Sequence, residues 1–270
     1  MSRRARRGAD SAWSVVIIGP RECVVTVKAL VVHVSRASGR RLQVERLRRS
    51  LPLAVEVIDA VDGLRLSDAD IRRVVVSGLH RPRYPFVLSR TEAACFLSHR
   101  KAWQAILDDG LDAGLVIEDD AAIAAPEFAA VLGAAVAGLE LDEFVRFPHR
   151  ERNESGPVVR LRGPARFLEP RLPALGMVMQ LVGREAARKL LDASRTFDRP
   201  VDSFVQMHWL HTARVLTVRP IVIGEICGQL GGSMIHPPHT GIAHKIIREV
   251  RRPLIRLAVY RENNRRRRAA

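Results

Sequence analysis

Cysteine and aromatic residues are scarce in this chain of 270 residues, and its apolar runs are short. The three cysteines, Cys23, Cys95 and Cys227, are odd in number and far apart, so neither a disulfide framework nor a structural zinc site is supported, and a reducing compartment such as the cytoplasm is expected. The longest stretch of low polarity, Phe128–Leu139, has 12 residues, whereas a membrane span needs about 20. It therefore predicts a buried helix. Aromatics make up only 5% of the chain, which disfavours a nucleic-acid surface built on base stacking.

Positive charge is abundant, and it is concentrated at the two ends of the chain. The formal net charge is +15, of which residues 1–50 carry +9 and residues 245–270 carry +8, while residues 51–244 carry −2. A near-neutral body with basic ends excludes a uniformly basic, histone-like protein. The hydrophobic content of 47% excludes general disorder.

Strands and helices are predicted to alternate along the first 150 residues. The predicted strands are residues 29–34, 55–58, 115–117 and 143–147, and the predicted helices between them are residues 40–49, 67–76, 89–107 and 126–139. This alternation predicts an α/β fold with a parallel sheet and right-handed crossovers. Further along the chain, the pattern at residues 201–210 predicts a helix.

Three carboxylates follow directly on the apolar strand at residues 115–117. Ligands of open α/β sheets bind beyond the carboxyl ends of the strands, and Glu118, Asp119 and Asp120 lie at such an end. Because side chains alternate along an extended chain, Glu118 and Asp120 are expected to point the same way and Asp119 the opposite way. Such a pair of carboxylates can hold a hard divalent cation. The alternative is a set of surface carboxylates that lead into a helix N-terminus, where the helix dipole favours them.

Several short motifs occur in a fixed order between residues 29 and 235. They are VVHVSRASGRR at 31–41, IDAVDG at 58–63, SRTEAACFLSHRKAWQAI at 89–106, LVIEDDA at 115–121, MQLVGREAARKLL at 179–191, RPVD at 199–202 and GSMI at 232–235. Each motif is weak alone, but together they resemble glycosyltransferase family 25, the lipopolysaccharide-biosynthesis and collagen-galactosyltransferase group. The sequence departs from the family pattern at His33, where the family has asparagine, and at Ala93-Ala94 before Cys95.

The resemblance implies a fold, a reaction and a cofactor. It implies a single GT-A-type domain that binds a nucleotide sugar, with a mostly parallel central sheet flanked by helices. The implied reaction moves galactose or glucose from a UDP-sugar to a saccharide or glycolipid acceptor, such as lipopolysaccharide or another cell-surface glycan, with inversion at the anomeric carbon. A divalent metal, Mn²⁺ or secondarily Mg²⁺, would stabilise the charge of the leaving diphosphate.

Individual residues can be assigned roles in that reaction. Glu118 and Asp120 are the expected metal ligands; the residues expected to bind the nucleotide sugar are Arg36, Asp62, Gly63, His99 and Asp119. An inverting transfer needs a carboxylate to deprotonate the acceptor hydroxyl, and Asp202 is the first candidate, with Glu225 the second. The alternatives are a solvated loop arginine for Arg36, a hydrogen-bonded structural histidine for His99 and a helix N-cap for Asp202.

The basic ends are expected to lie outside the enzyme domain. Residues 1–27 are expected to form a disordered basic leader, residues 28–243 the glycosyltransferase domain and residues 244–270 a basic amphipathic tail. The tail is expected either to contact an anionic membrane surface, which would place the protein on the inner face of the cytoplasmic membrane, or to remain solvated. Two rival functions stay open, an inactive scaffold and a nucleic-acid or anionic-surface binder, although no nucleic-acid partner is expected because no recognition motif is visible.

Overall fold

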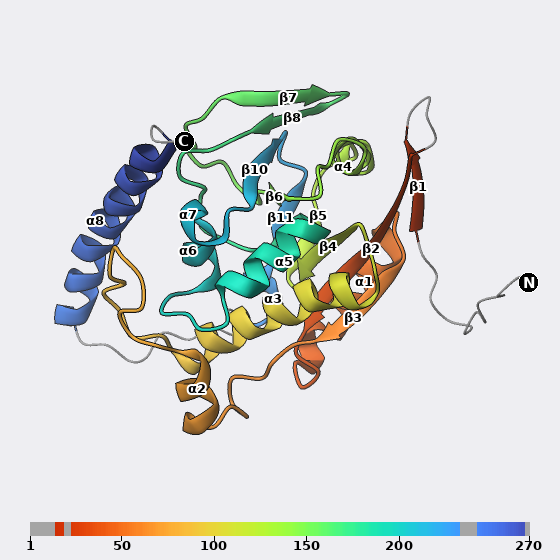
Figure 1. The fold of residues 1–270 in the computed structure, drawn as a ribbon. Coiled ribbons are helices and arrows are strands. Elements are labelled where there is room, and N and C mark those ends of the chain that lie inside the picture. Colours follow the sequence, from red (N-terminus) through yellow and green to blue (C-terminus); the bar gives the residue numbers. More distant parts are fainter. Residues whose placement is uncertain (1–13, 19–22, 233–241, 268–270) are drawn as a thin grey trace, which may run out of the picture.

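The computed structural model describes residues 14–18, 23–232 and 242–267, which form a large sheet with helices on both faces (Figure 1). The strands are β1 (Ser14–Ile18), β2 (Cys23–His33), β3 (Val55–Asp59), β4 (Ala113–Glu118), β5 (Ala121–Ile123), β6 (Glu143–Phe147), β7 (Val158–Arg162), β8 (Ala165–Leu168), β9 (Met179–Gly183), β10 (Arg214–Arg219) and β11 (Ile223–Glu225). The helices are α1 (Arg41–Ser50), α2 (Asp68–Val74), α3 (Arg90–Asp108), α4 (Phe128–Ala137), α5 (Arg184–Ala193), α6 (Val201–Val205), α7 (His208–His211) and α8 (Ile242–Arg267), with 3₁₀ turns at Ser38–Arg40 and Cys227–Leu230.

The α/β class is confirmed, and the sheet is mixed. Its strand order is β1-β2-β4-β9-β6-β10-β8-β7, with β3 also paired to β2. The strand β2 runs parallel to both β3 and β4, and β6 runs parallel to β10, whereas the other described pairs of this sheet are antiparallel. The sheet thus contains more antiparallel pairing than the sequence pattern predicted. The parallel part, β3-β2-β4, is the part that carries the predicted site.

Alternating side chains on the central strands build two separate cores, one on each face of the sheet. Val31 and Ile117 pack with α1 and α4, while Leu30 and Val116 pack with α3, α5 and α6. Each of these four side chains is fully buried, as expected for strands covered by helices on both faces. Burial on both faces explains why these strands are continuous apolar runs in the sequence.

Local signals predicted the start of the long helix α3 well, but they failed further along the chain. Ser89 caps α3, and a capping box with Glu92 satisfies backbone N–H groups that the first turn cannot pair internally. The predicted helix at 201–210 is wrong in its middle: α6 ends at Val205 and α7 begins at His208, because Met207 leaves the helical conformation (φ −95°, ψ 71°) and its side chain is fully buried. Burial of a side chain in the core has overridden the helical periodicity there.

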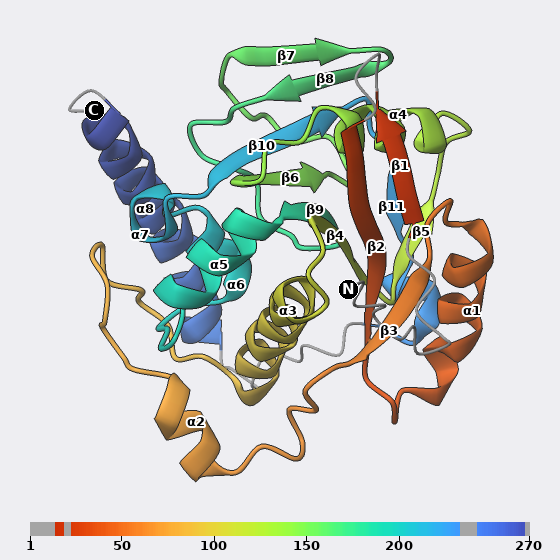
Figure 2. The ribbon, with the colours of Figure 1, turned by 45° about the vertical axis from the view of Figure 1, so that its right-hand side comes forward.

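The expected leader over residues 1–27 is partly wrong. Residues 14–18 form β1, which pairs antiparallel with residues 23–27 of β2, so that the hairpin extends one edge of the sheet (Figure 2). The physical reason is the β-branched content of both runs, SVVII and CVVTV, which suits paired strands better than a solvated leader. Residues 1–13 and 19–22 lie outside the described part of the chain.

The basic C-terminal segment is a helix that packs on the body, which corrects the expectation of a separate tail. Val259 and Asn263 of α8 are buried, and the Asn263 amide donates to the carbonyls of Arg171 and Gln206 at 3.0 Å each. An apolar side chain and a fully used amide donor hold the helix against the protein beside α7. None of the described helices has the length and apolar content of a membrane span.

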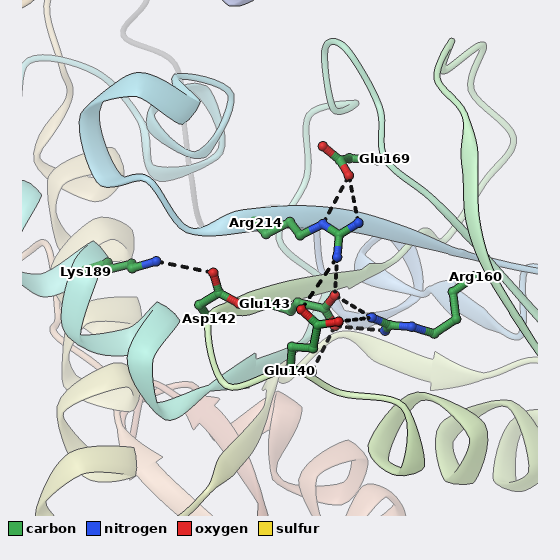
Figure 3. Close-up of polar contacts among 7 residues, drawn as sticks. All are labelled: Glu140, Asp142, Glu143, Arg160, Glu169, Lys189 and Arg214. Atoms are coloured by element: carbon green, nitrogen blue, oxygen red, sulfur yellow. Dashed lines mark hydrogen bonds and ion pairs between the residues drawn. The ribbon is translucent and has the colours of Figure 1, made fainter. Parts of the chain in front are cut away.

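A buried carboxylate at the start of β6 joins this strand to β7 and β10 (Figure 3). Glu143 is fully buried and accepts from Arg160 at 2.7 and 2.9 Å and from Arg214 at 3.2 Å. Glu140 and Glu169 complete the arginines' contacts at the surface. Because the charge of Glu143 is paired twice, its burial is compatible with a stable fold.

His211 couples the stability of the α6–α7 region to pH. Burial lowers the pKa of His211 to about 4 from its ordinary 6.5. The neutral ring is fully used, since Nε2 donates to the carbonyl of Val205 and Nδ1 accepts from the amide of Ala213. The folded pKa lies below the unfolded one, so this stabilisation is complete above about pH 6.5 and is lost as the pH falls towards 4.

We therefore expect His211→Gln to reduce the acid sensitivity of the fold. The free energy of unfolding is measured by urea titration at pH 7 and pH 4.5. Between these two pH values the wild type should lose about 2 kcal/mol more than the variant, because only the wild type must keep an imidazole neutral in its interior. An equal loss in the two proteins would show that protonation of His211 does not oppose folding.

Candidate active site

The predicted site forms where three parallel strands end. The register pairs Val32 with Glu118 and His33 with Asp59, so the loops that follow β2, β3 and β4 leave the sheet at the same edge. This is the edge at which ligands of α/β folds bind. A cavity of about 200 Å³ opens there.

Eight of the nine sequence-predicted site residues line this first pocket. They are Arg36, Asp62, Gly63, His99, Glu118, Asp119, Asp120 and Glu225. The ninth, Asp202, lines a second pocket of about 480 Å³. Glu118 and Cys95 line both pockets, so the two cavities meet at these side chains.

Asp119 is held by two neighbours from the β2 end. Its Oδ2 lies 2.7 Å from His33 Nδ1, and its Oδ1 accepts from Arg40 at 2.5 Å. Both carboxylate oxygens are thus engaged within the protein, which makes Asp119 a residue that positions the loop after β4. Arg40 also donates to Asp120 at 3.1 Å and to the carbonyl of Gly232 at 2.9 Å.

Asp120 has the features of a ligand-binding carboxylate. It is 8% exposed, and its Oδ1 has no hydrogen-bond partner among the described residues. Burial and the nearby charge of Glu118 raise the pKa of Asp120 to about 6, against the opposing effect of Arg40. A buried oxygen without a partner is costly unless a ligand satisfies it.

Pairing of β5 with β11 brings Glu225 beside Asp120. Glu225 is opposite Ala121 in this two-stranded sheet, and the amide of Ile226 donates to the carbonyl of Asp120 at 2.9 Å. The side chains of Asp120, Glu225 and Cys227 offer ligand atoms within 4.8 Å of one another. Two carboxylates and an unpaired buried oxygen suit a hard divalent cation, so the residues fit the metal that the family resemblance implies.

Glu118 lies in a different cluster from Asp120, although the sequence pattern paired them as metal ligands. Its Oε1 is 3.2 Å from Nε2 of the buried His99 and 4.0 Å from the sulfur of Cys95. Cys95 and His99 are four residues apart on α3, which places both side chains on the helix face toward β4. Burial raises the pKa of the Cys95 thiol well above its usual range.

Arg36 and Asp62 form the rim of the first pocket. Arg36 Nε donates to Asp62 at 2.6 Å, and this hydrogen bond lowers the pKa of Asp62. Arg36 therefore has a partner at Nε, and its terminal guanidinium nitrogens, which form no hydrogen bond with the residues that the structure describes, can bind an anionic group. Gly63 allows close packing, because an added Cβ would meet the Cα of Thr91 at 3.0 Å.

Asp202 lies in the first turn of α6, whose N-cap is Pro200, so it is not the N-cap that the sequence alternative suggested. Its Oδ1 accepts from the amide of Ser203 at 2.6 Å. Burial raises the pKa of Asp202. A carboxylate with a raised pKa at the wall of a pocket is suited to accept a proton.

Sequence reasoning did not assign a functional role to Arg40, Cys227 or Tyr84. Arg40 was part of an expected amphipathic helix, and the motif of two adjacent arginines at its start was its only signal. Cys227 begins a 3₁₀ turn and lies in the cluster with Asp120 and Glu225, and Tyr84 lines the second pocket from a loop; neither has a local sequence pattern. Their places depend on tertiary structure.

Comparisons with known proteins agree with the motifs. Residues 26–157 match the model of glycosyltransferase family 25 (LPS biosynthesis protein). Procollagen galactosyltransferase 1 of Danio rerio is 33% identical over 96 residues, which is 34% of this chain and 16% of that protein. Procollagen galactosyltransferase 2 of Homo sapiens is 32% identical over 93 residues, covering 33% and 15%.

Not every relative carries an activity in its name. The protein called inactive glycosyltransferase 25 family member 3 of Homo sapiens is 35% identical over 99 residues, covering 34% of this chain and 16% of that protein. The matched part of this chain thus spans about one sixth of these relatives. A solved structure of mannose-1-phosphate geranyltransferase from Thermus thermophilus aligns over 71% of this chain and 73% of that one, with 13% identity and a TM-score of 0.38, which is too distant to bear on the site.

The family match covers β2 to β6 and therefore includes Glu118, Asp119 and Asp120 together with the loops after β2 and β3. The sequence motifs, the pocket and the family match coincide in this region. Residues 26–157 of this chain are thus similar to glycosyltransferase family 25.

Proposed function

We propose that this protein is an inverting glycosyltransferase that moves galactose or glucose from a UDP-sugar to a saccharide or glycolipid acceptor. One observation carries the proposal: eight residues that the sequence singles out line one pocket at the carboxyl ends of β2, β3 and β4. One of them, Asp120, has a buried carboxylate oxygen with no hydrogen-bond partner in the described part of the chain. The acceptor class that we favour is lipopolysaccharide or another cell-surface glycan.

The donor is proposed to occupy the first pocket. Its nucleotide would lie against the Asp62-Gly63 turn, and its diphosphate would lie near Arg36 and the acidic cluster. Asp120 and Glu225 would hold Mn²⁺ or Mg²⁺, and the cation would supply charge stabilisation to the leaving diphosphate. Asp119, through His33 and Arg40, keeps the loop that bears Asp120 in place.

The acceptor is proposed to enter from the second pocket, which meets the first at Glu118 and Cys95. Asp202 takes the proton of the attacking hydroxyl, the hydroxyl oxygen bonds to the anomeric carbon, and the bond from that carbon to the diphosphate breaks. Attack from the face opposite the diphosphate inverts the anomeric configuration.

Replacement of Asp202 by asparagine is expected to impair transfer to the acceptor and to leave binding of the donor nucleotide intact. Asparagine keeps an oxygen that can accept from Ser203 but cannot take up a proton, so transfer to acceptor should fall about a hundredfold or more. Binding of UDP with Mn²⁺, measured by calorimetry, should stay within about twofold of wild type. Transfer at the wild-type rate would rule out Asp202 as the base.

A screen of UDP-sugars for metal-dependent hydrolysis tests the proposed activity. Turnover of UDP-galactose or UDP-glucose that requires Mn²⁺ or Mg²⁺ would support it. The second candidate function is an inactive scaffold, which the inactive human relative suggests. Absence of turnover with every UDP-sugar, in protein that is folded, would favour the scaffold.

The helix α8 supports a location at an anionic membrane surface as a further part of the proposal. Leu254 and Leu257 are exposed on it, at 60% and 43%, among arginines that are also exposed. Basic helices with exposed apolar side chains bind anionic lipid surfaces. Because α8 packs on the body, its deletion would disturb the fold, so point variants of its arginines are the suitable test of binding to anionic vesicles.

A further inference from the structure

One face of α8 forms a wall of the second pocket. Arg252, Ile255, Arg256 and Val259 all line it, and their spacing of three, four and seven residues places them along a single helix face. The same face continues to Asn263, which anchors the helix to the body. The basic C-terminal segment therefore contributes directly to a site.

The neighbouring wall is aromatic. Tyr84 and Phe86 lie in the loop between α2 and α3 with their rings edge to face, 5.4 Å apart, and both line the second pocket. Because aromatic residues make up only 5% of the chain, two adjacent rings in one pocket indicate a surface for a ligand. Aromatic rings combine an apolar face with low conformational entropy, which suits contact with the C–H face of a sugar.

The charges of the second pocket differ from wall to wall. Its carboxylates are Glu92, Glu118 and Asp202; Glu92 is engaged in the capping box of α3, and Glu118 also lines the first pocket. Arg252 and Arg256 line it from α8. The third arginine, Arg199, is buried and paired with Asp198 at 2.7 Å, which balances its charge. Arg256 forms no ion pair with any carboxylate of the described residues, so its charge is available to a ligand.

We propose that the acceptor is an anionic saccharide, whose sugar packs against Tyr84 and Phe86 and whose phosphate or carboxylate binds Arg256 and Arg252. This inference rests on the proposed function, because it names the acceptor class of the same site. A guanidinium recognises phosphate and carboxylate oxygens through paired N–H donors. The helix α8 thus selects the acceptor by charge, and Asp202 deprotonates its hydroxyl.

Binding of glucose 6-phosphate and glucose, compared by ligand-observed NMR on the full chain saturated with UDP and Mn²⁺, tests the proposal. Glucose 6-phosphate should bind about tenfold or more tightly than glucose. Arg256→Gln and Arg252→Gln should each weaken the binding of glucose 6-phosphate about three- to tenfold and leave that of glucose unchanged. The matched control is Arg261→Gln, which removes an exposed arginine of the same helix that does not line the pocket.

Three results would overturn the proposal. The first is equal binding of the two sugars. The second is an equal loss in Arg261→Gln, which would indicate general attraction to a basic helix. The third comes from vesicles of phosphatidylcholine with phosphatidylglycerol: if Arg256→Gln weakens vesicle binding and leaves glucose 6-phosphate binding intact, the arginines serve lipid headgroups. Calorimetry of UDP with Mn²⁺ on the same samples reports separately on the first pocket, so failure of the proposed function is distinguishable.

Discussion

Replacement of Asp120 by asparagine is expected to lower metal-dependent turnover of a UDP-sugar about a hundred- to a thousandfold. The carboxylate is buried, its Oδ1 has no partner among the described residues, and it lies with Glu225 in the cluster that suits a divalent cation. Loss of one charged ligand from such a site removes several kcal/mol of charge stabilisation from the leaving diphosphate. Steady-state kinetics with the UDP-sugar identified by the screen measure the effect.

The same substitution should leave the fold at least as stable. Burial raises the pKa of Asp120 to about 6, which means that at higher pH its ionised form is disfavoured in the folded protein relative to the unfolded chain. Asparagine removes this cost, so the melting temperature at pH 7.5 should stay equal or rise. Asp192→Asn, at an exposed helix position paired with Arg195, is the control for loss of a carboxylate. A large drop in melting temperature for Asp120→Asn would point to a structural role instead.

Replacement of Glu143 by glutamine is expected to lower the free energy of unfolding by about 3 kcal/mol or more. Glu143 is fully buried and neutralises Arg160 and Arg214, whose side chains are 18% and 32% exposed (Figure 3). Without Glu143, the two arginines keep only their contacts with Glu140 and Glu169 near the surface, and the fully buried part of the ionic network is lost. Urea unfolding at pH 7 measures the loss.

Glu140→Gln is the matched control, because Glu140 pairs with the same Arg160 but is 60% exposed. An exposed pair is screened by solvent, and its loss should cost less than about 1 kcal/mol. Equal losses in the two variants would show that burial does not set the strength of this network. Both variants lie away from the first pocket and should keep UDP binding.

The sequence was sufficient for the part of the site that depends on parallel strands. The apolar strand before Glu118 and the motifs at Asp62-Gly63 and Arg36 each predicted a strand end, and parallel ends must meet at one edge of a sheet. The convergence of these three loops therefore followed from the fold class. The identity of the reaction came from the family resemblance and stays a proposal.

The remaining parts depend on contacts that leave no local pattern. Glu225 reaches Asp120 through the β5–β11 pairing, across a long stretch of the sequence, whereas Glu118 belongs to the cluster with Cys95 and His99. The sequence pattern paired Glu118 with Asp120 because side chains alternate along an extended strand. That rule does not apply to this pair, because β4 ends at Glu118 and Asp120 lies in the turn that follows.

Charge composition was informative about the ends of the chain but not about their structure. The excess of arginine predicted a separate tail, whereas Val259 and Asn263 fix α8 to the body. Two buried side chains among many exposed arginines of the same helix are invisible to a net-charge argument. The packing places part of that charge in the second pocket, next to Tyr84 and Asp202.

Calorimetric titration of UDP into the wild-type protein, with and without Mn²⁺, tests the central claim that the first pocket binds a nucleotide sugar through a metal. The predicted result is saturable binding that requires Mn²⁺. Asp120→Asn should abolish this binding, and Asp192→Asn should retain it. Absence of metal-dependent binding in the folded wild-type protein, or full binding in Asp120→Asn, would contradict the account.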